Sequence, residues 1–412
     1  MASQHNSHAT TRTPPALRRT LTLPLLTLYG LGVTVGAGIY VLIGATVAEA
    51  GAYAWLAFLL AAFVVAFTAF SYAELATRYP VSAGEAAYVD AGFGRPALAT
   101  LVGGLVALSG MVSASAVAVG ASGYLGGLTS LSSPVLIIAI VTTMGLIAWW
   151  GISQSVKVAA VITVLEILGL AFVIAWGFGM SQRGGVATAE LFPPLQGAHW
   201  GGIASASLLA FFAFIGFEDM VNVAEEVETP RKTMPRAIVY TLFVATVLYV
   251  LVAISVLLAV PIETLSGSDE PLTLVFANAP TAVQSGFAAI AVVATVNGVL
   301  IQMIMASRVI YGMAQRGRFP AVFANISPKT QTPTVATLFV AACIMGLSLF
   351  LPIERLAGWT SQIVLFVFVC VNLSLIAIKR RNAPSGEYYK VPIAVPVLGI
   401  LTSVALLVST LL

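Results

Sequence analysis

Charged residues are scarce in this 412-residue chain. Asp, Glu, Lys and Arg together make up 8% of the sequence, whereas an ordinary soluble domain contains about 25%. Hydrophobic residues account for 59%, and the mean hydropathy is +0.99. These charges are too few to cover a water-soluble surface, so the composition excludes a soluble domain and predicts a chain embedded in a lipid bilayer.

Histidine and cysteine are also rare, with three and two residues respectively. His5 and His8 precede the first apolar run and His199 lies between two others, while Cys343 and Cys370 lie singly inside apolar runs. No HExxH motif and no metal-ligand spacing is present. We therefore expect no metal, no cofactor and no enzymatic activity, and we expect both cysteines to pack as small apolar side chains.

Long apolar runs recur along the whole sequence, each near the roughly 20 residues that a helix needs to cross a bilayer. The alternating ten-residue segments of a β-barrel are not found. The sequence thus predicts an all-α polytopic membrane protein with about eleven spans. These are residues 23–49, 53–76, 97–125, 134–152, 156–178, 202–225, 236–260, 284–312, 333–351, 355–378 and 392–411.

The basic residues support this count and fix an orientation. With the N-terminus in the cytoplasm, every Lys and Arg except Arg183 and Arg355 falls on the cytoplasmic side, as the positive-inside rule requires. The net charge of +3 therefore reflects topology, and we expect no nucleic-acid partner. We predict a multi-pass protein of the cell membrane, and the sequence leaves its oligomeric state open.

Two spans contain apparent interruptions at corresponding places. The first carries Gly36 and Gly38 near its middle, and the sixth carries Gly216 followed by Glu218 and Asp219. Breaks five helices apart indicate two inverted repeats of five helices each. The expected divisions are a disordered cytoplasmic tail (1–20), a first repeat (21–180), a second repeat (181–380) and an additional C-terminal helix (381–412).

An interrupted helix frees backbone groups, which cost several kcal/mol each in lipid unless protein or a water-filled cavity satisfies them. Freed N–H groups can bind a carboxylate, and freed carbonyls can accept from an ammonium group or hold a cation. An α-amino acid zwitterion requires both. The alternative is that these glycines only allow close helix packing.

Several separated motifs resemble those of the amino acid–polyamine–organocation transporters, in particular bacterial amino acid permeases. The likeness extends from Leu21 to Pro333 and depends on the joint order of its parts. These parts are Gly36-Ala37-Gly38-Ile39; Tyr72-Ala73-Glu74-Leu75 with Pro80, Ser82-Ala83-Gly84-Glu85 and Tyr88; Phe214-Ile215-Gly216-Phe217-Glu218 with Glu225-Glu226, Pro230 and Pro235-Arg236-Ala237; and Arg308 to Gly317 with Arg318-Phe319-Pro320 and Thr332-Pro333. The resemblance implies a LeuT-like fold with discontinuous first and sixth helices, and transport by alternating access.

The resemblance also implies where a substrate binds. Backbone groups of the first break would hold its carboxylate, carbonyls of the sixth helix would receive its amino group, and two Phe side chains would form walls or gates. The residues concerned are Val35, Gly36, Ala37, Gly38 and Ile39 in the first break; Phe212, Ala213, Ile215 and Gly216 in the second; and Phe214 and Phe217 as the walls or gates.

Glu166 lies midway along the fifth span. A charged side chain costs about 2.5–3.5 kcal/mol at that depth, so an intramembrane carboxyl is a functional candidate. Proton-coupled relatives often have Lys in this helix, and this sequence departs from them. Glu166 is interpreted as the carrier of a coupling proton, as a protonated structural residue, or as a cation ligand. We expect H⁺ as the coupling ion, with Na⁺ as the alternative.

The sequence says less about the side chain of the substrate than about its α-amino and α-carboxyl groups. No Lys, Arg or His lies near the proposed pocket, so neutral amino acids are the first expectation, with cationic amino acids or polyamines as the alternative. Glu218 and Asp219 are placed to attract a cationic substrate, although acidic residues here are common in the family. Glu74 is expected at the interface. Symport and antiport both stay open, and a channel or a transport-derived sensor are alternatives of another class.

Overall fold

The computed structural model of the chain describes residue 19 and residues 21–36, 38–81, 84–150, 156–180, 185–192, 199–327, 332–381 and 387–409. Apart from Arg19, the predicted tail over residues 1–20 lies outside the described residues. Helices dominate the described part, where the β structure consists of one isolated bridge between Leu21 and Val227.

The α-helices follow the predicted spans closely. They are α1 (Leu23–Val35), α2 (Gly38–Ala50), α3 (Ala54–Arg78), α4 (Gly84–Phe93), α5 (Pro96–Gly126), α6 (Ser133–Trp150), α7 (Val156–Gly179), α8 (Trp200–Phe212), α9 (Pro230–Ala259), α10 (Ile262–Ser266), α11 (Thr281–Gln315), α12 (Thr334–Phe350), α13 (Ile353–Arg380) and α14 (Ala394–Val408). Short 3-10 helices connect them: η1 (Gly51–Tyr53), η2 (Thr188–Leu191), η3 (Phe217–Glu226), η4 (Thr273–Phe276) and η5 (Ala321–Ala324).

Within the described residues, seven helical stretches are long and apolar enough to cross a membrane. One of them, Gly38–Arg78, contains both α2 and α3, so it holds half of the first predicted span and all of the second. The shorter apolar helices α1, α6, α12 and α14 account for the remaining predicted spans. The prediction of a polytopic helical membrane protein is therefore confirmed.

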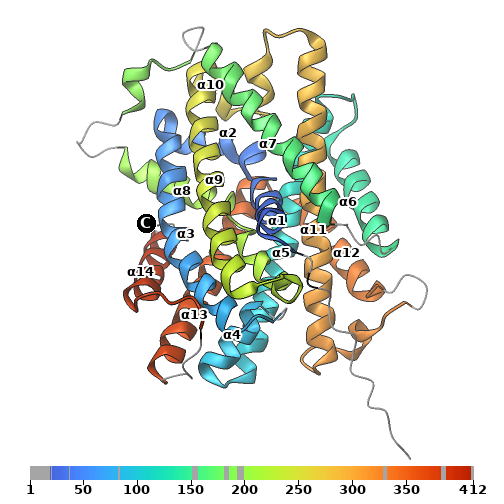
Figure 1. The fold of residues 1–412 in the computed structure, drawn as a ribbon. Helices are drawn as coiled ribbons and strands as arrows, with labels where there is room; N and C mark the ends of the chain where they lie inside the picture. The colour runs from blue at the N-terminus through green and yellow to red at the C-terminus, as the bar shows by residue number, and fades with distance from the viewer. Residues whose placement is uncertain are drawn as a thin grey trace, which may run out of the picture.

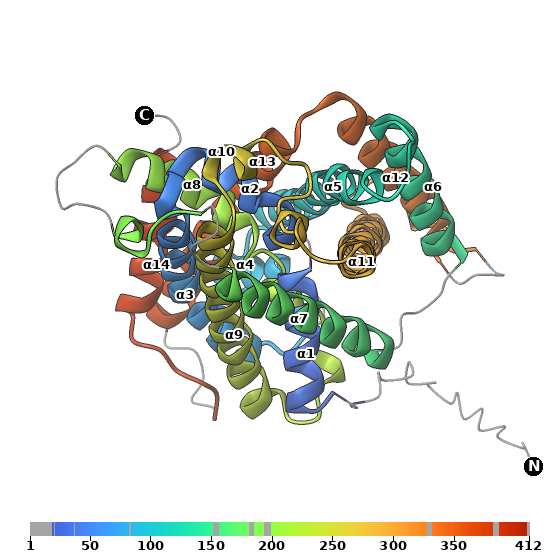
Figure 2. The same cartoon turned by 90° about the horizontal axis from the view of Figure 1, so that it is seen from above.

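The helices form an upright bundle with α5 and α11 near its centre (Figures 1 and 2). α4 lies at one end of the bundle and α10 at the other (Figure 1). Large apolar side chains such as Leu168, Phe243 and Leu338 are exposed by 59%, 67% and 60%. Outward-facing apolar residues of this kind suit a lipid environment, since lipid offers no polar partner to the helix surface.

The predicted interruptions of the first and sixth helices are present. α1 ends at Val35 and α2 begins at Gly38, with Ala37 outside the described residues. The sixth helix stops at Phe212, passes through turns over residues 213–216, and continues as a 3-10 helix from Phe217. Gly216 has φ 121°, a conformation that is open to glycine and strained for other residues. The division of the chain into two inverted repeats stays a prediction.

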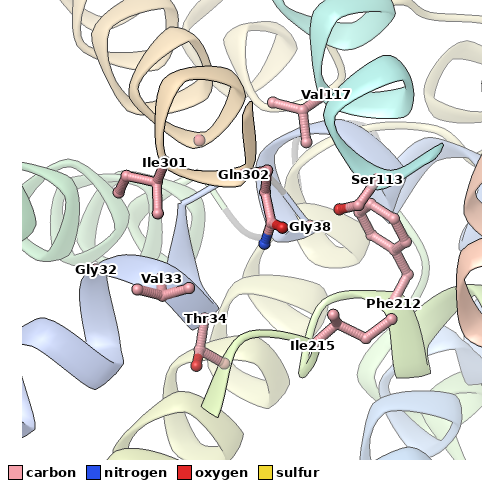
Figure 3. Close-up of a pocket in the computed structure, with 11 residues that line it drawn as sticks. Gly32, Val33, Thr34, Gly38, Ser113, Val117, Phe212, Ile215, Ile301 and Gln302 are labelled. Atoms are coloured by element: carbon pink, nitrogen blue, oxygen red, sulfur yellow. The ribbon is translucent and has the colours of Figure 1, made fainter. Parts of the chain in front are cut away.

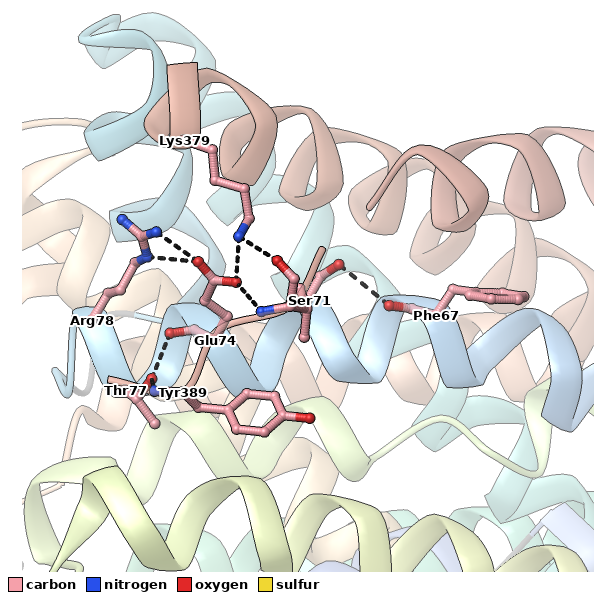
Figure 4. Close-up of polar contacts among 8 residues, drawn as sticks. Phe67, Ser71, Glu74, Thr77, Arg78, Lys379 and Tyr389 are labelled. Atoms are coloured by element: carbon pink, nitrogen blue, oxygen red, sulfur yellow. Dashed lines mark hydrogen bonds and ion pairs between the residues drawn. The ribbon is translucent and has the colours of Figure 1, made fainter. Parts of the chain in front are cut away.

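Glu74, which was expected at the interface near the end of its span, is the hub of a buried polar cluster. Its side chain is fully buried and pairs with Arg78 and with Lys379, each at 2.6 Å. It also accepts a hydrogen bond from the backbone N–H of Val391 at 2.8 Å. Figure 4 shows how these contacts tie the end of α3 to the end of α13 and to the segment that leads into α14.

Candidate functional site

The two helix breaks lie directly against each other. A Cβ added to Gly38 would lie 2.2 Å from Cα of Ala213, and a Cβ added to Gly216 would lie 2.8 Å from the carbonyl oxygen of Val33. Neither position has room for a side chain. The glycines therefore allow the two interrupted segments to approach through their backbones, at the level where each helix is broken.

Tyr249 of α9 links the same two segments. Its buried hydroxyl lies 2.7 Å from the carbonyl oxygen of Thr34 and 2.7 Å from that of Ala213. A hydroxyl has one hydrogen to donate, so the two carbonyls share it. The ring packs edge-to-face against Phe214 with centroids 5.0 Å apart. This tyrosine therefore satisfies carbonyls that the breaks leave without a helical partner.

A cavity opens beside the breaks (Figure 3). α1, α2, α5, α11 and the end of α8 contribute to its wall. The lining residues are Gly32, Val33, Thr34, Gly38, Ser113, Val117, Phe212, Ile215, Gly298, Ile301 and Gln302.

Three of the predicted site residues line this first cavity: Gly38, Phe212 and Ile215. α2 begins at Gly38, and the amides of the first turn of a helix have no partner within the helix. The positive end of the helix dipole therefore lies at the cavity wall. An anionic group in the cavity would meet backbone donors at that point.

The other predicted substrate-binding residues that the structure describes are buried and do not line this cavity. Val35 and Ile39 are 0% exposed, and Ala37 lies outside the described residues. Phe214 packs against Tyr249, while Phe217 packs against Tyr72 and Phe368 with centroids 5.7 and 5.6 Å apart. Both Phe rings thus belong to aromatic clusters in this conformation, and their role as walls or gates stays a prediction.

The backbone of the second break is partly occupied by internal hydrogen bonds. The N–H of Ile215 donates to the carbonyl of Phe212 at 3.1 Å, and the N–H of Gly216 donates to Oε2 of Glu218 at 2.9 Å. The carbonyl of Ala213 accepts from Tyr249. Carbonyl oxygens have two lone pairs, so Phe212 and Ala213 each keep one for a further donor.

A second cavity adjoins the first and extends to Glu85 of α4. Ser113, Ile215 and Gln302 line both cavities. The second contains three buried carboxyl groups, from Glu85, Glu218 and Asp219, which are 4%, 7% and 6% exposed. Burial raises the pKa of the Glu85 carboxyl, and the hydrogen bond that it accepts from the Tyr72 hydroxyl at 3.2 Å opposes this shift.

Comparison with known proteins places this architecture in one family. The family model described as amino acid permease matches residues 21–412. The chain belongs to the amino acid permease family.

Individual relatives differ in their substrates. The permease is 30% identical to the branched-chain amino acid permease BcaP of Bacillus subtilis, over 95% of this chain and 87% of that protein. It is also 30% identical to the vacuolar cationic amino acid transporter 2 of Arabidopsis thaliana, over 90% of this chain and 61% of that longer protein. A methylthioribose transporter of Bacillus subtilis is 26% identical over 94% of this chain and 87% of that protein. The predicted resemblance is therefore confirmed.

Glu166 of the permease is buried in α7, at 1% exposure. The hydroxyl of Tyr40, on the helix that follows the first break, donates to the backbone carbonyl of Glu166 at 3.0 Å. The side-chain amide of Asn297 on α11 lies beside its carboxyl group. Glu166 thus lies between α2 and α11, outside the residues that line the two cavities.

Aromatic side chains close the permease on the α10 side of the breaks. Tyr40 stacks on Phe287 with centroids 6.2 Å apart, and Phe287 packs on Phe276 at 4.8 Å. The hydroxyl of Tyr124 donates to the backbone carbonyl of Tyr40. All four rings are almost completely buried. The cavities therefore extend toward α4 and away from α10.

Two features of the site were missed by the sequence analysis. Tyr249 and Gln302 are buried polar side chains within long apolar helices, and such positions in a membrane span are candidates for functional contacts.

Proposed function

We propose that this permease is a secondary active transporter that carries amino acids across the cell membrane by alternating access, with its N-terminus in the cytoplasm. The observation that supports this most directly is the backbone contact between Gly38 and Ala213 beside the first cavity. A contact of this kind places helix-terminal amides and freed carbonyls within the reach of one small molecule.

The α-carboxylate of the substrate is proposed to bind at the start of α2, with Val35, Gly36, Ala37, Gly38 and Ile39 forming the first break. The α-ammonium group is proposed to donate to carbonyls of the second break. Phe212, Ala213 and Ile215 are the acceptors in this proposal, and the neighbouring Phe214, Gly216 and Phe217 hold the break in its conformation. Helix-terminal amides favour anions, and freed carbonyls favour cations.

The proposed substrates are amino acids without an anionic side chain. None of the residues that line the two cavities is Lys, Arg or His, so an acidic side chain would be desolvated without a cationic partner. The named relatives include a branched-chain amino acid permease and a cationic amino acid transporter. Neutral and cationic side chains both fit this range.

Transport is proposed to be coupled to H⁺ through Glu166, with Na⁺ as the alternative ion. This carboxyl lies deep in α7 and next to the helix that follows the first break. A buried carboxyl that gains and loses a proton changes the charge beside a mobile segment. No resident cofactor enters the proposal.

Uptake by the purified full-length chain in proteoliposomes tests the proposed function. We expect radiolabelled leucine or lysine to accumulate above its external concentration when the lumen is made alkaline. Gly38→Val should abolish this uptake. Uptake that stops at equal concentrations under H⁺ and Na⁺ gradients would indicate a channel or facilitator. Absence of uptake and exchange for all common amino acids would refute the proposal.

A further inference from the structure

Gln302 is a polar side chain in the centre of the bundle that forms no hydrogen bond with the described part of the protein. It lies on α11 and is 7% exposed. Figure 3 shows its amide pointing from α11 into the space beside the two breaks. Among the described residues, none forms a hydrogen bond with this amide. A buried primary amide offers two donors and one acceptor oxygen, so whatever occupies the cavity must satisfy them.

The position of Gln302 makes it a connecting point between the two cavities. Together with Ser113 and Ile215 it lines both of them. A molecule whose α-carboxylate and α-ammonium groups lie at the breaks would have to pass these three residues to reach the second cavity. The second cavity therefore lies where the far end of a long substrate side chain would be.

The second cavity has a strongly acidic lining. Glu85, Glu218 and Asp219 come from α4 and η3, and all three are at least nine-tenths buried. Glu85 accepts from the Tyr72 hydroxyl, and Glu218 accepts from the N–H of Gly216. Within the described part of the chain, none of the three forms an ion pair, and the Asp219 carboxyl accepts no hydrogen bond.

Buried carboxyl groups without a counter-charge disfavour a ligand with an anionic side chain and favour one with a cationic side chain. Carboxyl groups removed from water interact strongly with any charge that enters the same space, because screening there is weak. A cationic end that enters this space favours the ionised form of the carboxyl groups, whereas an anionic end disfavours it. The unpaired amide of Gln302 also disfavours an aliphatic side chain. Such a side chain would leave the buried amide without a hydrogen-bond partner, which lowers affinity.

The geometry points to a side-chain subsite, formed by Gln302 and Asp219, that selects amino acids whose long side chain ends in an ammonium or guanidinium group. This inference rests on the proposed function and adds the substrate class to it. The carbonyl oxygen of the Gln302 amide accepts from the cationic end, and Asp219, whose ionised form is favoured once a cation enters the same space, supplies the opposite charge. An apolar wall for the alkyl stem is formed by Ile215, Val364 and Val367.

This inference revises the order of substrates expected from the sequence. That expectation put neutral amino acids first because basic side chains are missing from the pocket. A pocket for cationic substrates is also expected to have no basic side chains. The unpaired amide of Gln302, which faces the acidic lining, separates the two cases, because an aliphatic side chain leaves this amide without a partner.

L-Lysine and L-norleucine form the matched pair of probes, since norleucine keeps the four-carbon stem and lacks the ammonium group. Binding of each to the purified full-length permease is measured by competition against radiolabelled lysine and by thermal shift. We expect lysine to bind at least about tenfold more tightly than norleucine. Leaving a buried polar group unpaired typically costs that much in affinity.

Two variants assign the effect to the subsite. Gln302→Met replaces the amide by an apolar chain of similar length, and Asp219→Asn removes the charge. Each should lower the lysine-to-norleucine affinity ratio about tenfold while norleucine binding is retained, which shows that the variant is folded. Glu354→Gln, at an exposed carboxyl in the first turn of α13, is the matched control and should leave the ratio unchanged.

Norleucine binding as tight as lysine binding in the unmodified chain overturns the inference, whatever the variants do. An unchanged ratio in both variants overturns it as well. If leucine is transported and lysine is not, the subsite inference is wrong and the proposed function stands. If no amino acid is bound or transported, the proposed function fails together with it.

Discussion

Gly38 on α2 lies against the backbone of Ala213, at 2.2 Å from Ala213 Cα to the place where a Cβ on Gly38 would lie. The contact joins two segments that are far apart in the sequence, and it brings both helix breaks to the same cavity. The amino acid permease therefore depends on the absence of a side chain at this position.

Gly38→Ala should impair transport while the protein still inserts and folds. The methyl group has to displace backbone, and overpacking of this kind costs about 1–3 kcal/mol. A cost of that size in the substrate-bound state lowers affinity by about 5- to 150-fold. Proteoliposome uptake at several substrate concentrations measures it. Gly104→Ala is the control, because a Cβ there meets no atom within 4 Å; equal uptake by the two variants would contradict the prediction.

Tyr249→Phe should loosen the link between the breaks. The substitution keeps the ring that packs on Phe214 and removes the hydroxyl shared by the carbonyls of Thr34 and Ala213. We expect a loss of about 1–3 kcal/mol in stability, because buried carbonyls lose their donor. Thermal unfolding in detergent measures the loss. Tyr240→Phe, at a side chain 49% exposed, should unfold like the unmodified protein, and the same behaviour from Tyr249→Phe would exclude the proposed link.

Glu166→Gln should separate transport from the proton gradient. The substitution preserves the size of the side chain and prevents it from releasing a proton at physiological pH. We expect accumulation driven by an alkaline lumen to fall to the level measured without a gradient, while exchange of labelled for unlabelled substrate continues. Both rates are measured in the same proteoliposomes. Unchanged stimulation by the pH gradient would remove Glu166 from the coupling mechanism.

Glu74→Gln should destabilise the end of the bundle near α4. The substitution leaves Arg78 and Lys379 without their carboxylate partner, although their side chains are only 9% and 15% exposed. Breaking a buried ion pair from one side costs about 3–5 kcal/mol. Thermal unfolding of the detergent-solubilised protein measures this. The double variant Glu74→Gln with Lys379→Met should recover part of the loss, whereas additive losses would show that the two residues act independently.

The helical spans and the two breaks could be predicted from the sequence because both depend on local features. Apolar length decides whether a segment can cross a bilayer, and Gly36, Gly38 and Gly216 mark where helices stop. Predicted spans such as 97–125 and 284–312 agree with α5 and α11 to within a few residues. Likewise, Gly38, Phe212 and Ile215 were expected in the site and line the first cavity.

The environment of individual polar side chains could not be predicted in the same way. Glu74 was expected at the interface, and its pairing with Lys379, which lies 305 positions along the chain, could not be predicted from the sequence. Gln302 was not predicted as a site residue, because a glutamine in an apolar helix usually forms a hydrogen bond with a neighbouring helix. Whether the Gln302 amide has a hydrogen-bond partner depends on the packing of the surrounding helices, which the sequence does not show.

The sequence by itself determined that this chain is a helical membrane protein of the amino acid permease type, with interruptions in its first and sixth helices. Hydropathy and glycine placement are properties of short segments, so they need no knowledge of distant neighbours. Only the tertiary structure decided that the breaks touch at Gly38 and Ala213, and that Gln302 and Asp219 face a shared space. Burial, pairing and cavity shape arise from contacts between helices that are remote in sequence, and these contacts exist only in the folded bundle.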